Sequence, residues 1–179
     1  GRDIKAVAIV SKQAFTYVFD RVTGEPVWPI EERPVPQGDV PGEWYSPTQP
    51  FPTKPPPFED QGASIDQLVD FPPEIRALAV EAVRNHRLGG LFTPPMLSAD
   101  DGLQGTIQRP AIAGGANWNG SAVDPETGLL YVPSNNAFSV MHYYTPDPAD
   151  GGNLNLTQGG FDTAPLMPQG LPLFKPPYS

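Results

Sequence analysis

A short pattern that occurs twice constrains the fold of this chain more than any other feature. In each copy an apolar, strand-like run ends in an aspartate, and two variable residues, a Thr-Gly pair and a second apolar run follow: TYVFDRVTGEPVW (16–28) and SAVDPETGLLYVP (121–133). An aspartate carboxylate accepts hydrogen bonds from turn N–H groups two or three residues on, and glycine adopts the positive φ that closes such a turn. Each copy therefore predicts a β-hairpin, in which Asp20 and Asp124 are turn residues rather than catalytic carboxylates.

Repeated hairpins of this kind are typical of a β-propeller, in which every blade ends in the same outer hairpin. The chain holds 25 Pro and 18 Gly among 179 residues, yet its 39% hydrophobic content is that of a folded protein. We therefore expect ordered loops between short strands. Two hairpins with exposed edges do not close a sheet. The pattern predicts a mainly β fold: roughly two blades of a larger propeller, with an insertion between the hairpins.

The chain divides by composition into four parts. They are a first blade hairpin (1–32), a Pro-rich and helical insertion (33–113), a second blade hairpin (114–145) and a loop towards a next blade (146–179). Strands are predicted at 6–10, 14–19 and 26–31. Proline lacks an N–H donor, so the Pro-rich tract at 33–58 is expected to run extended over the surface and to form no central strand.

One clear helix is predicted inside the insertion. Asp70 is its candidate cap, and Pro72 and Pro73 suit its first turn. A single apolar stripe follows at helical spacing, and Gly89-Gly90 ends the segment: the stripe is Ile75, Leu78, Ala79, Ala82 and Val83. A shorter helical segment is expected at 64–69.

Charge and composition exclude several classes of function. The formal net charge is −9 with scattered Lys and Arg, so the basic face that nucleic-acid binding requires is missing. We expect no signal peptide within these residues, and they contain no apolar run near about 18 residues. There is no Cys, and His86 and His142 have no ligand-like neighbours, so no metal site is predicted in this chain. Because it begins in mid-strand without Met, we expect a fragment of a longer protein.

Two places combine residue types suited to ligand binding. Lys12 is a lone cation between two apolar strands; it is either a solvated turn lysine or a cation held at the inner end of a blade, facing a ligand. Asn117 and Trp118 follow two glycines, and offer an amide and a flat apolar wall beside backbone that permits close approach. The simpler interpretation of that pair is a turn asparagine beside a core tryptophan.

Several short motifs follow one another along the chain. They are SKQAFTYVFDRVTG (11–24) around Lys12, PVPQG (34–38), SPTQPF (46–51), LFTPP (91–95), GGANW (114–118), DPETGLLYVP (124–133) and GLPLFKPPY (170–178). These collinear motifs resemble the quinoprotein dehydrogenases that use pyrroloquinoline quinone (PQQ), most closely the membrane-type glucose dehydrogenase branch, and the first resembles the lysine-centred segment of that family. The resemblance spans nearly the whole chain.

The resemblance implies an eight-bladed β-propeller with PQQ near its axis, beside a bound Ca²⁺ or Mg²⁺. By it, Lys12 matches the family's cation near the quinone oxygens, Asn117 matches a position that hydrogen-bonds PQQ, and Trp118 is assigned to the cofactor rim. A preorganised ammonium in a desolvated site stabilises the negative charge that reduction builds on those oxygens. The family's aspartate base, metal ligands and ring-supporting tryptophan lie upstream of the lysine segment, so we expect the 179 residues alone to be inactive.

The resemblance further implies oxidation of a glucose-like sugar or an alcohol, electron transfer to ubiquinone or a cytochrome, and a periplasmic parent protein attached to the inner membrane. Two alternatives stay open at this point. One is a non-catalytic propeller scaffold or binding module; the other is a Pro-rich interaction protein whose hairpins are incidental. Exposed strand edges also allow a homo-oligomer, such as a swapped dimer.

Overall fold

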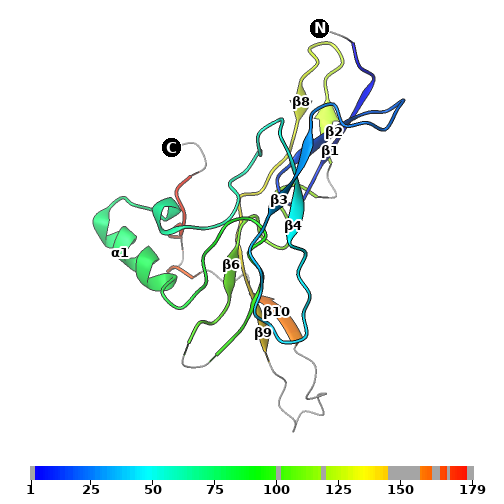
Figure 1. The fold of residues 1–179 in the computed structure, drawn as a ribbon. Helices are drawn as coiled ribbons and strands as arrows, with labels where there is room; N and C mark the ends of the chain where they lie inside the picture. The colour runs from blue at the N-terminus through cyan, green and yellow to red at the C-terminus, as the bar shows by residue number, and fades with distance from the viewer. Residues whose placement is uncertain are drawn as a thin grey trace.

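The computed structural model describes residues 3–99, 102–117, 120–144, 158–162, 166–168 and 170–176, and its elements are mostly short strands (Figure 1). The elements are β1 (Ala6–Val10), β2 (Thr16–Asp20), β3 (Ile30–Pro34), β4 (Thr48–Pro52), the 3₁₀ turn η1 (Ile65–Gln67), α1 (Pro73–Ala82), β5 (Met96–Leu97), β6 (Thr106–Gln108), β7 (Ala122–Val123), β8 (Leu130–Tyr131), β9 (Ser139–Tyr144) and β10 (Gln158–Asp162). The mainly β prediction is confirmed.

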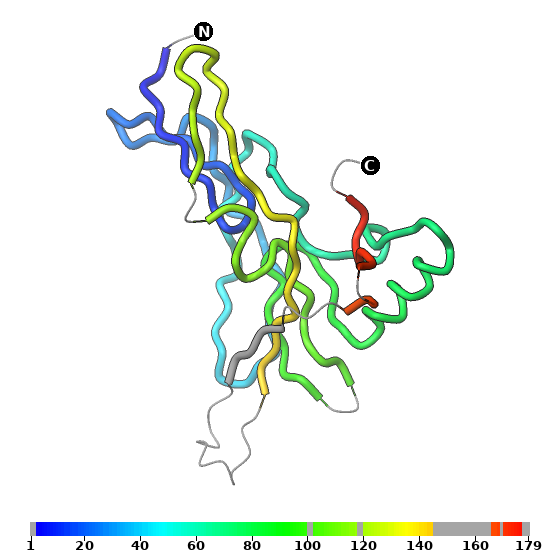
Figure 2. The backbone as a smooth tube through the Cα atoms, turned by 180° about the vertical axis from the view of Figure 1, so that it is seen from behind, coloured from blue at the N-terminus to red at the C-terminus, as the bar shows by residue number. Residues whose placement is uncertain are grey.

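The two D-x-x-T-G turns form as predicted. The Asp20 carboxylate accepts the Val22 N–H at 2.9 Å, and Asp124 accepts the Glu126 N–H at 2.9 Å and the Thr127 hydroxyl at 2.7 Å. The bond from Thr127 is the main reason why the pKa of Asp124 is lowered. The glycines that close the turns have φ of 80° at Gly24 and 72° at Gly128. Both hairpins lie at the same end of the molecule (Figures 1 and 2).

The strand predicted at 26–31 is wrong in extent. The chain pairs with β2 only around a single bridge between Phe19 and Pro26, and β3 then begins at Ile30. Pro26 and Pro29 lack the N–H that a continuous ladder requires. β3 pairs instead with β4, which lies inside the Pro-rich tract and places Pro50 and Pro52 opposite Glu32 and Ile30. In the described part of the chain β4 has β3 as its one neighbour, so no central strand contains these prolines.

The largest sheet was not predicted. β9 is its centre and pairs antiparallel with β10 and β6 and parallel with β5. Its sequence, SVMHYY, is rich in aromatic and β-branched residues, which was the available signal. β5 and β6 come from the stretch expected to be Pro-rich and helical, and β10 lies in the stretch expected to be loop. That loop expectation is wrong for 158–162.

The two predicted helical segments are present, with two corrections. α1 ends at Ala82 because the chain then pairs through Arg87 with Thr106 and through Gly89 with Ala63, so the predicted end at Gly89-Gly90 is wrong. η1 occupies the expected short segment, and α1 begins at Pro73 with Pro72 as its cap residue and no capping side chain. Asp70 does not cap the helix, because it precedes the cap position and instead binds Lys175 at 2.6 Å. Of the predicted stripe, Leu78 is 44% exposed and the other members pack on the core. No helix among the described residues is long and apolar enough to cross a bilayer.

The apolar core is formed by residues from several segments of the chain. Its buried members are Ala63, Leu68, Val69, Ala79, Val83, Ile107, Val140, Met167 and Leu173. α1 therefore packs on a core to which β6, β9 and the segment near the described C-terminal end also contribute (Figure 1).

Replacing Leu68 by alanine should lower the free energy of unfolding by about 2–5 kcal/mol, because the residue is 0% exposed and a cavity is left. Leu78→Ala is the matched control: the side chain is 44% exposed, and the expected loss is about 0.5 kcal/mol. Urea unfolding measures both. Equal losses would contradict the assignment of Leu68 to the core.

His86 follows α1, and burial lowers its pKa from 6.5, with the Ala82 carbonyl acting in the opposite direction. The fold thus favours the neutral ring, and stability should fall as the pH drops below 6.5, where the unfolded chain takes up the proton first. An NMR titration of the ring should give a midpoint below 6.5, with His86→Gln identifying the signal. A midpoint at or above that value would contradict the burial of the ring.

Candidate functional site

Lys12 lies in the tight turn between β1 and β2. The Ser11 N–H donates to the Phe15 carbonyl at 2.9 Å, and the Phe15 N–H donates to the Ser11 hydroxyl at 3.2 Å. Ala14 has a φ of 67°, so the chain reverses sharply after the lysine. The Lys12 ammonium is exposed and donates to the Ile112 carbonyl at 3.2 Å. Since an ammonium has three donors, this contact leaves others for a ligand.

Aromatic rings anchor this turn against two distant segments. Phe15 is 2% exposed and packs edge-on against Phe51 with ring centroids 5.4 Å apart. Phe51 in turn packs edge-on against Phe92 at 5.6 Å. Edge-to-face pairs are the favoured geometry of aromatic rings. Three of the motifs read in the sequence, at 11–24, 46–51 and 91–95, thus meet at one place.

The glycine loop that contains the predicted Asn117 packs directly on Lys12. Gly114 has a φ of 88°, and a Cβ there would lie 2.6 Å from the Cα of Lys12. The Gly115 N–H donates to the Lys12 carbonyl at 3.0 Å. The sequence predicted that these glycines permit close approach of a ligand; the structure shows close approach of the Lys12 backbone. Asn117 is exposed, and Trp118 lies outside the described residues.

Lys12 and Asn117 line two adjoining pockets rather than one. The Lys12 pocket has a volume of about 220 Å³ and is lined by Gln13, Phe92, Gln108, Arg109 and Ile112, among others. Asn117 lines a second pocket of about 270 Å³ with the glycine loop and 133–135. The two pockets meet along the chain at Ile112 and Ala113. By the family resemblance both residues would face the same cofactor; among the described residues they line separate pockets.

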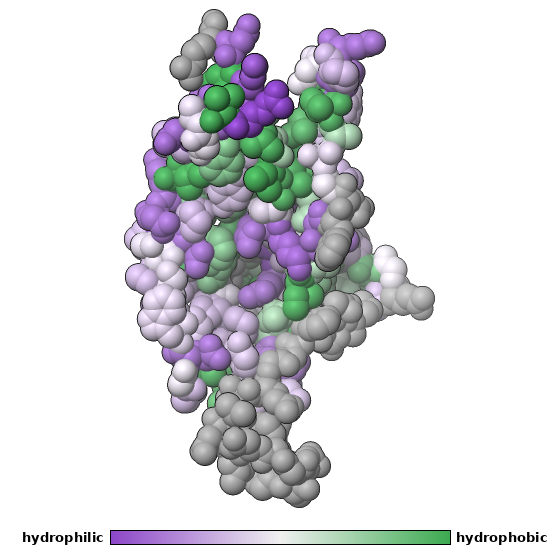
Figure 3. Space-filling view, turned by 90° about the vertical axis from the view of Figure 1, so that its right-hand side faces the viewer, coloured by the Kyte–Doolittle hydropathy of each residue, from purple (hydrophilic) through white to green (hydrophobic). Residues whose placement is uncertain are grey.

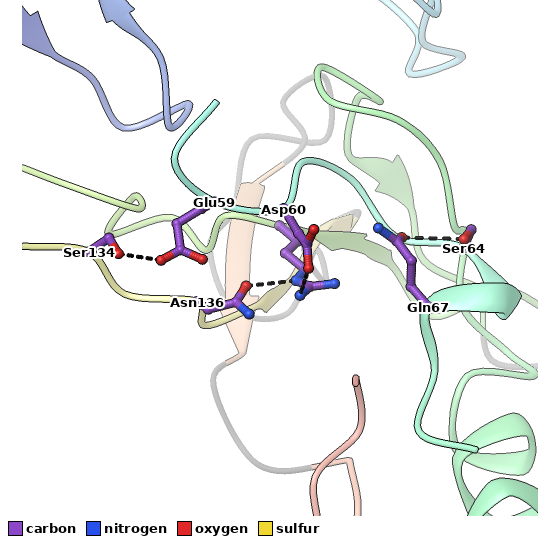
Figure 4. A network of polar contacts seen from close by, with 7 residues as sticks. Glu59, Asp60, Ser64, Gln67, Ser134 and Asn136 are labelled. Carbon is purple, nitrogen blue, oxygen red and sulfur yellow. Dashed lines mark hydrogen bonds and ion pairs between the residues drawn. The ribbon is translucent and has the colours of Figure 1, made fainter. Parts of the chain in front are cut away.

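The structure adds a buried polar cluster that sequence reasoning missed. The Arg109 side chain is 1% exposed, and its Nη2 binds the Asp60 carboxylate at 2.5 Å. Its Nε donates to the Asn136 amide oxygen at 2.9 Å, and its guanidinium lies 4.6 Å from the Phe174 ring centroid. Beside this contact the Ser134 hydroxyl binds Glu59 (Figure 4). No spacing pattern singles out Arg109, which stands alone in a loop.

The charge on Arg109 and the metal-ligand side chains among the described residues limit the chemistry of this cluster. Burial lowers the pKa of Arg109, and the neighbouring Asp60 charge acts in the opposite direction. Among the described residues, no group of three or more His, Asp or Glu side chains is arranged to hold a metal ion. The cluster is therefore a paired buried charge, and the donors that face a ligand are those of Lys12 and the residues around its pocket.

Comparison with known proteins defines the family. The whole chain, residues 1–179, matches the PQQ family described as the β-propeller domain of glucose, ethanol and alcohol dehydrogenases. The chain belongs to this family, and its sheets are part of a β-propeller.

Curated relatives agree. The chain is 36% identical over 70% of its length to the quinoprotein glucose dehydrogenase of Escherichia coli (strain K12), covering 15% of that protein. It is 32% identical over 71% of its length to the quinate/shikimate dehydrogenase (quinone) of Acinetobacter baylyi, covering 15% of that protein. It is 29% identical over 98% of its length to the glycerol dehydrogenase large subunit of Gluconobacter thailandicus, covering 22% of that protein. The chain thus spans a fifth or less of most of these relatives. No solved structure matches.

Gly114→Ala should displace the Lys12 turn. The substitution adds about 1–2 kcal/mol of left-handed backbone strain and a further steric cost of about 1–3 kcal/mol against Lys12. Gly42→Ala is the matched control, because its φ is 86° but nothing lies within 4 Å of an added Cβ. We expect a larger loss of unfolding free energy for Gly114→Ala, with shifted amide resonances at 11–15. Equal losses without such shifts would contradict the close contact.

Proposed function

We propose that the protein carrying this chain oxidises a sugar, a polyol or another alcohol with PQQ, and that Lys12 is the cation beside the quinone. Support comes from the family match and from relatives named glucose, glycerol and quinate/shikimate dehydrogenases. The observation that carries the proposal is the Lys12 ammonium at a pocket of about 220 Å³, held by one carbonyl and with donors to spare.

The residues present fit part of a PQQ site. A quinone with acidic substituents requires donors and cations, and it requires apolar walls for its flat ring. The Lys12 pocket offers the ammonium, the Gln108 side chain and the Phe92 ring, and the neighbouring pocket offers the exposed Asn117 amide. When bound, PQQ supplies the hydride acceptor and a Ca²⁺ or Mg²⁺ ion supplies a Lewis acid. The proposal assigns no metal ligand to this chain.

Lys12 does electrostatic work in this proposal. Its positive charge stabilises negative charge that develops on a quinone oxygen, and its turn is held in place before the ligand arrives, so little reorganisation is needed. Asn117 is assigned a hydrogen bond to the cofactor, and Trp118 the cofactor rim.

The proposal also includes the electron acceptor, the cellular location of the parent protein and the division of the chain into parts. Electrons leave to ubiquinone or a cytochrome, and the parent protein faces the periplasm. The net charge of −9 gives no support to a nucleic-acid partner. The division of the chain at residues 32, 113 and 145 is retained as part of the proposal, with β5 and β6 inside the insertion and β10 inside the connecting segment. Homo-oligomer formation through exposed edges is also retained.

A non-catalytic propeller scaffold is the second candidate. The observation in its favour is that Lys12 and Asn117 line separate pockets. A scaffold would neither bind PQQ nor oxidise substrate, whether or not Lys12 is present.

The deciding experiment is dye-linked oxidation of glucose and simple alcohols by the complete polypeptide, reconstituted with PQQ and Ca²⁺. Lys12→Ala should lower kcat by about 10²- to 10³-fold while PQQ still binds, because a preorganised charge is lost. Lys54→Ala, which removes an exposed lysine outside the pocket, is the control and should retain full activity.

Absence of both PQQ binding and dye reduction in the intact protein would leave only the scaffold. The 179 residues alone, given PQQ and Ca²⁺, are expected to bind weakly and not to turn over substrate. Robust turnover by them would overturn the view that further catalytic groups come from other parts of the polypeptide.

A further inference from the structure

The buried guanidinium of Arg109 lies where segments distant in sequence converge. It binds Asp60 at 2.5 Å and Asn136 at 2.9 Å, and each partner belongs to a different loop (Figure 4). Removing one partner of a buried, hydrogen-bonded charge pair is strongly destabilising, because the other charge is left uncompensated. Here the Arg109 side chain is 1% exposed and Asp60, at 38%, supplies the charge that compensates it.

The loop that carries Asp60 clamps the Lys12 turn. On one side of Asp60, the Phe58 N–H donates to the Ala14 carbonyl at 3.0 Å. On the other side, the Gln61 side-chain amide donates to the Gln13 carbonyl at 2.6 Å. The two residues that follow Lys12 are thus bound from both sides of Asp60.

The loop that carries Asn136 clamps the glycine loop. The N–H of the adjacent Asn135 donates to the Gly115 carbonyl at 2.7 Å, and the Gly115 N–H donates to the Lys12 carbonyl at 3.0 Å. Glu59 and Ser134 tie the two clamping loops to each other. Arg109 therefore binds one residue of each clamping loop. Asp60 lies in the loop that holds the residues after Lys12, and Asn136 lies in the loop that holds Gly115.

We propose that Arg109, with Asp60, is a positioning residue that sets the Lys12 turn against the Gly114–Gly115 loop. Arg109 also lines the Lys12 pocket, but the role proposed here is exerted through these loops, which its Nε and Nη2 bind. The inference rests on the proposed function for its catalytic consequence, but the positioning itself does not depend on PQQ.

Hydrogen exchange on the complete apo-protein tests the positioning directly. In Arg109→Met, exchange of the Gly115 amide and of peptides covering 11–15 should quicken by about 10-fold or more. Arg87→Met is the matched control, since it removes another Arg–Asp pair, Arg87 with Asp39 at 2.5 Å, whose members belong to neither clamping loop. It should leave both regions unchanged.

A double-mutant cycle tests the catalytic consequence. Arg109→Met should lower kcat by about 10- to 100-fold in the reconstituted protein, the cost of a small misplacement of a catalytic group. It should cause no further loss in the Lys12→Ala background, because the two act as a unit. Arg109→Lys keeps the charge and loses the planar fork, so partial rescue is expected.

The outcomes are separable. Unchanged exchange in Arg109→Met overturns the positioning role whatever the activity. Equal kcat losses with and without Lys12 show a general structural role and also overturn it. Absence of PQQ activity in the unsubstituted protein removes the proposed function, and exchange still decides the positioning. If Arg109→Met does not fold, Arg109→Lys and Asp60→Asn carry the same comparisons.

Discussion

The ion pair between the buried Arg109 guanidinium and the partly exposed Asp60 carboxylate is the interaction on which the arrangement of the candidate site depends. A charge that is 1% exposed has to be compensated where it lies, and it is compensated by groups on two loops and by the face of Phe174. One of these loops binds the carbonyls of Gln13 and Ala14, and the other binds Gly115, whose N–H donates to the Lys12 carbonyl. Charge burial and the placement of the lysine are therefore consequences of one packing arrangement.

A second constraint is the absence of side chains at Gly114 and Gly115. The Lys12 turn approaches this loop so closely that a Cβ at Gly114 would overlap it. Backbone bonds, rather than side-chain contacts, then join the two segments. The Phe15, Phe51 and Phe92 rings support the turn from the other direction. A cation held in this way loses little freedom when a ligand binds, which is the property that electrostatic catalysis requires.

In contrast to the packed Lys12 turn, the two outer hairpins leave apolar surface uncovered. Large apolar side chains remain exposed there, and Figure 3 shows apolar groups at the surface near the hairpin end of the molecule. Examples are Ile9 at 52%, Val123 at 63% and Tyr131 at 56% exposure. Such faces with open strand edges are costly for an isolated sheet and are those that neighbouring blades cover in a propeller. This agrees with a chain that spans about a fifth of its relatives' length.

The sequence by itself determined the local features of this protein: the two aspartate turns, the helix start at Pro73, the Lys12 turn and the family. Each depends on residues a few positions apart, so their chemistry is readable along the chain. The sequence did not predict the strand pairing at 26–31 or the sheet around β9, because the strands that pair there lie far apart in sequence. Only the tertiary structure decided that Arg109, Asp60 and Asn136 support Lys12, and that Lys12 and Asn117 line separate pockets. The reason is physical: these contacts exist only once loops that are unrelated in sequence are packed around a buried charge.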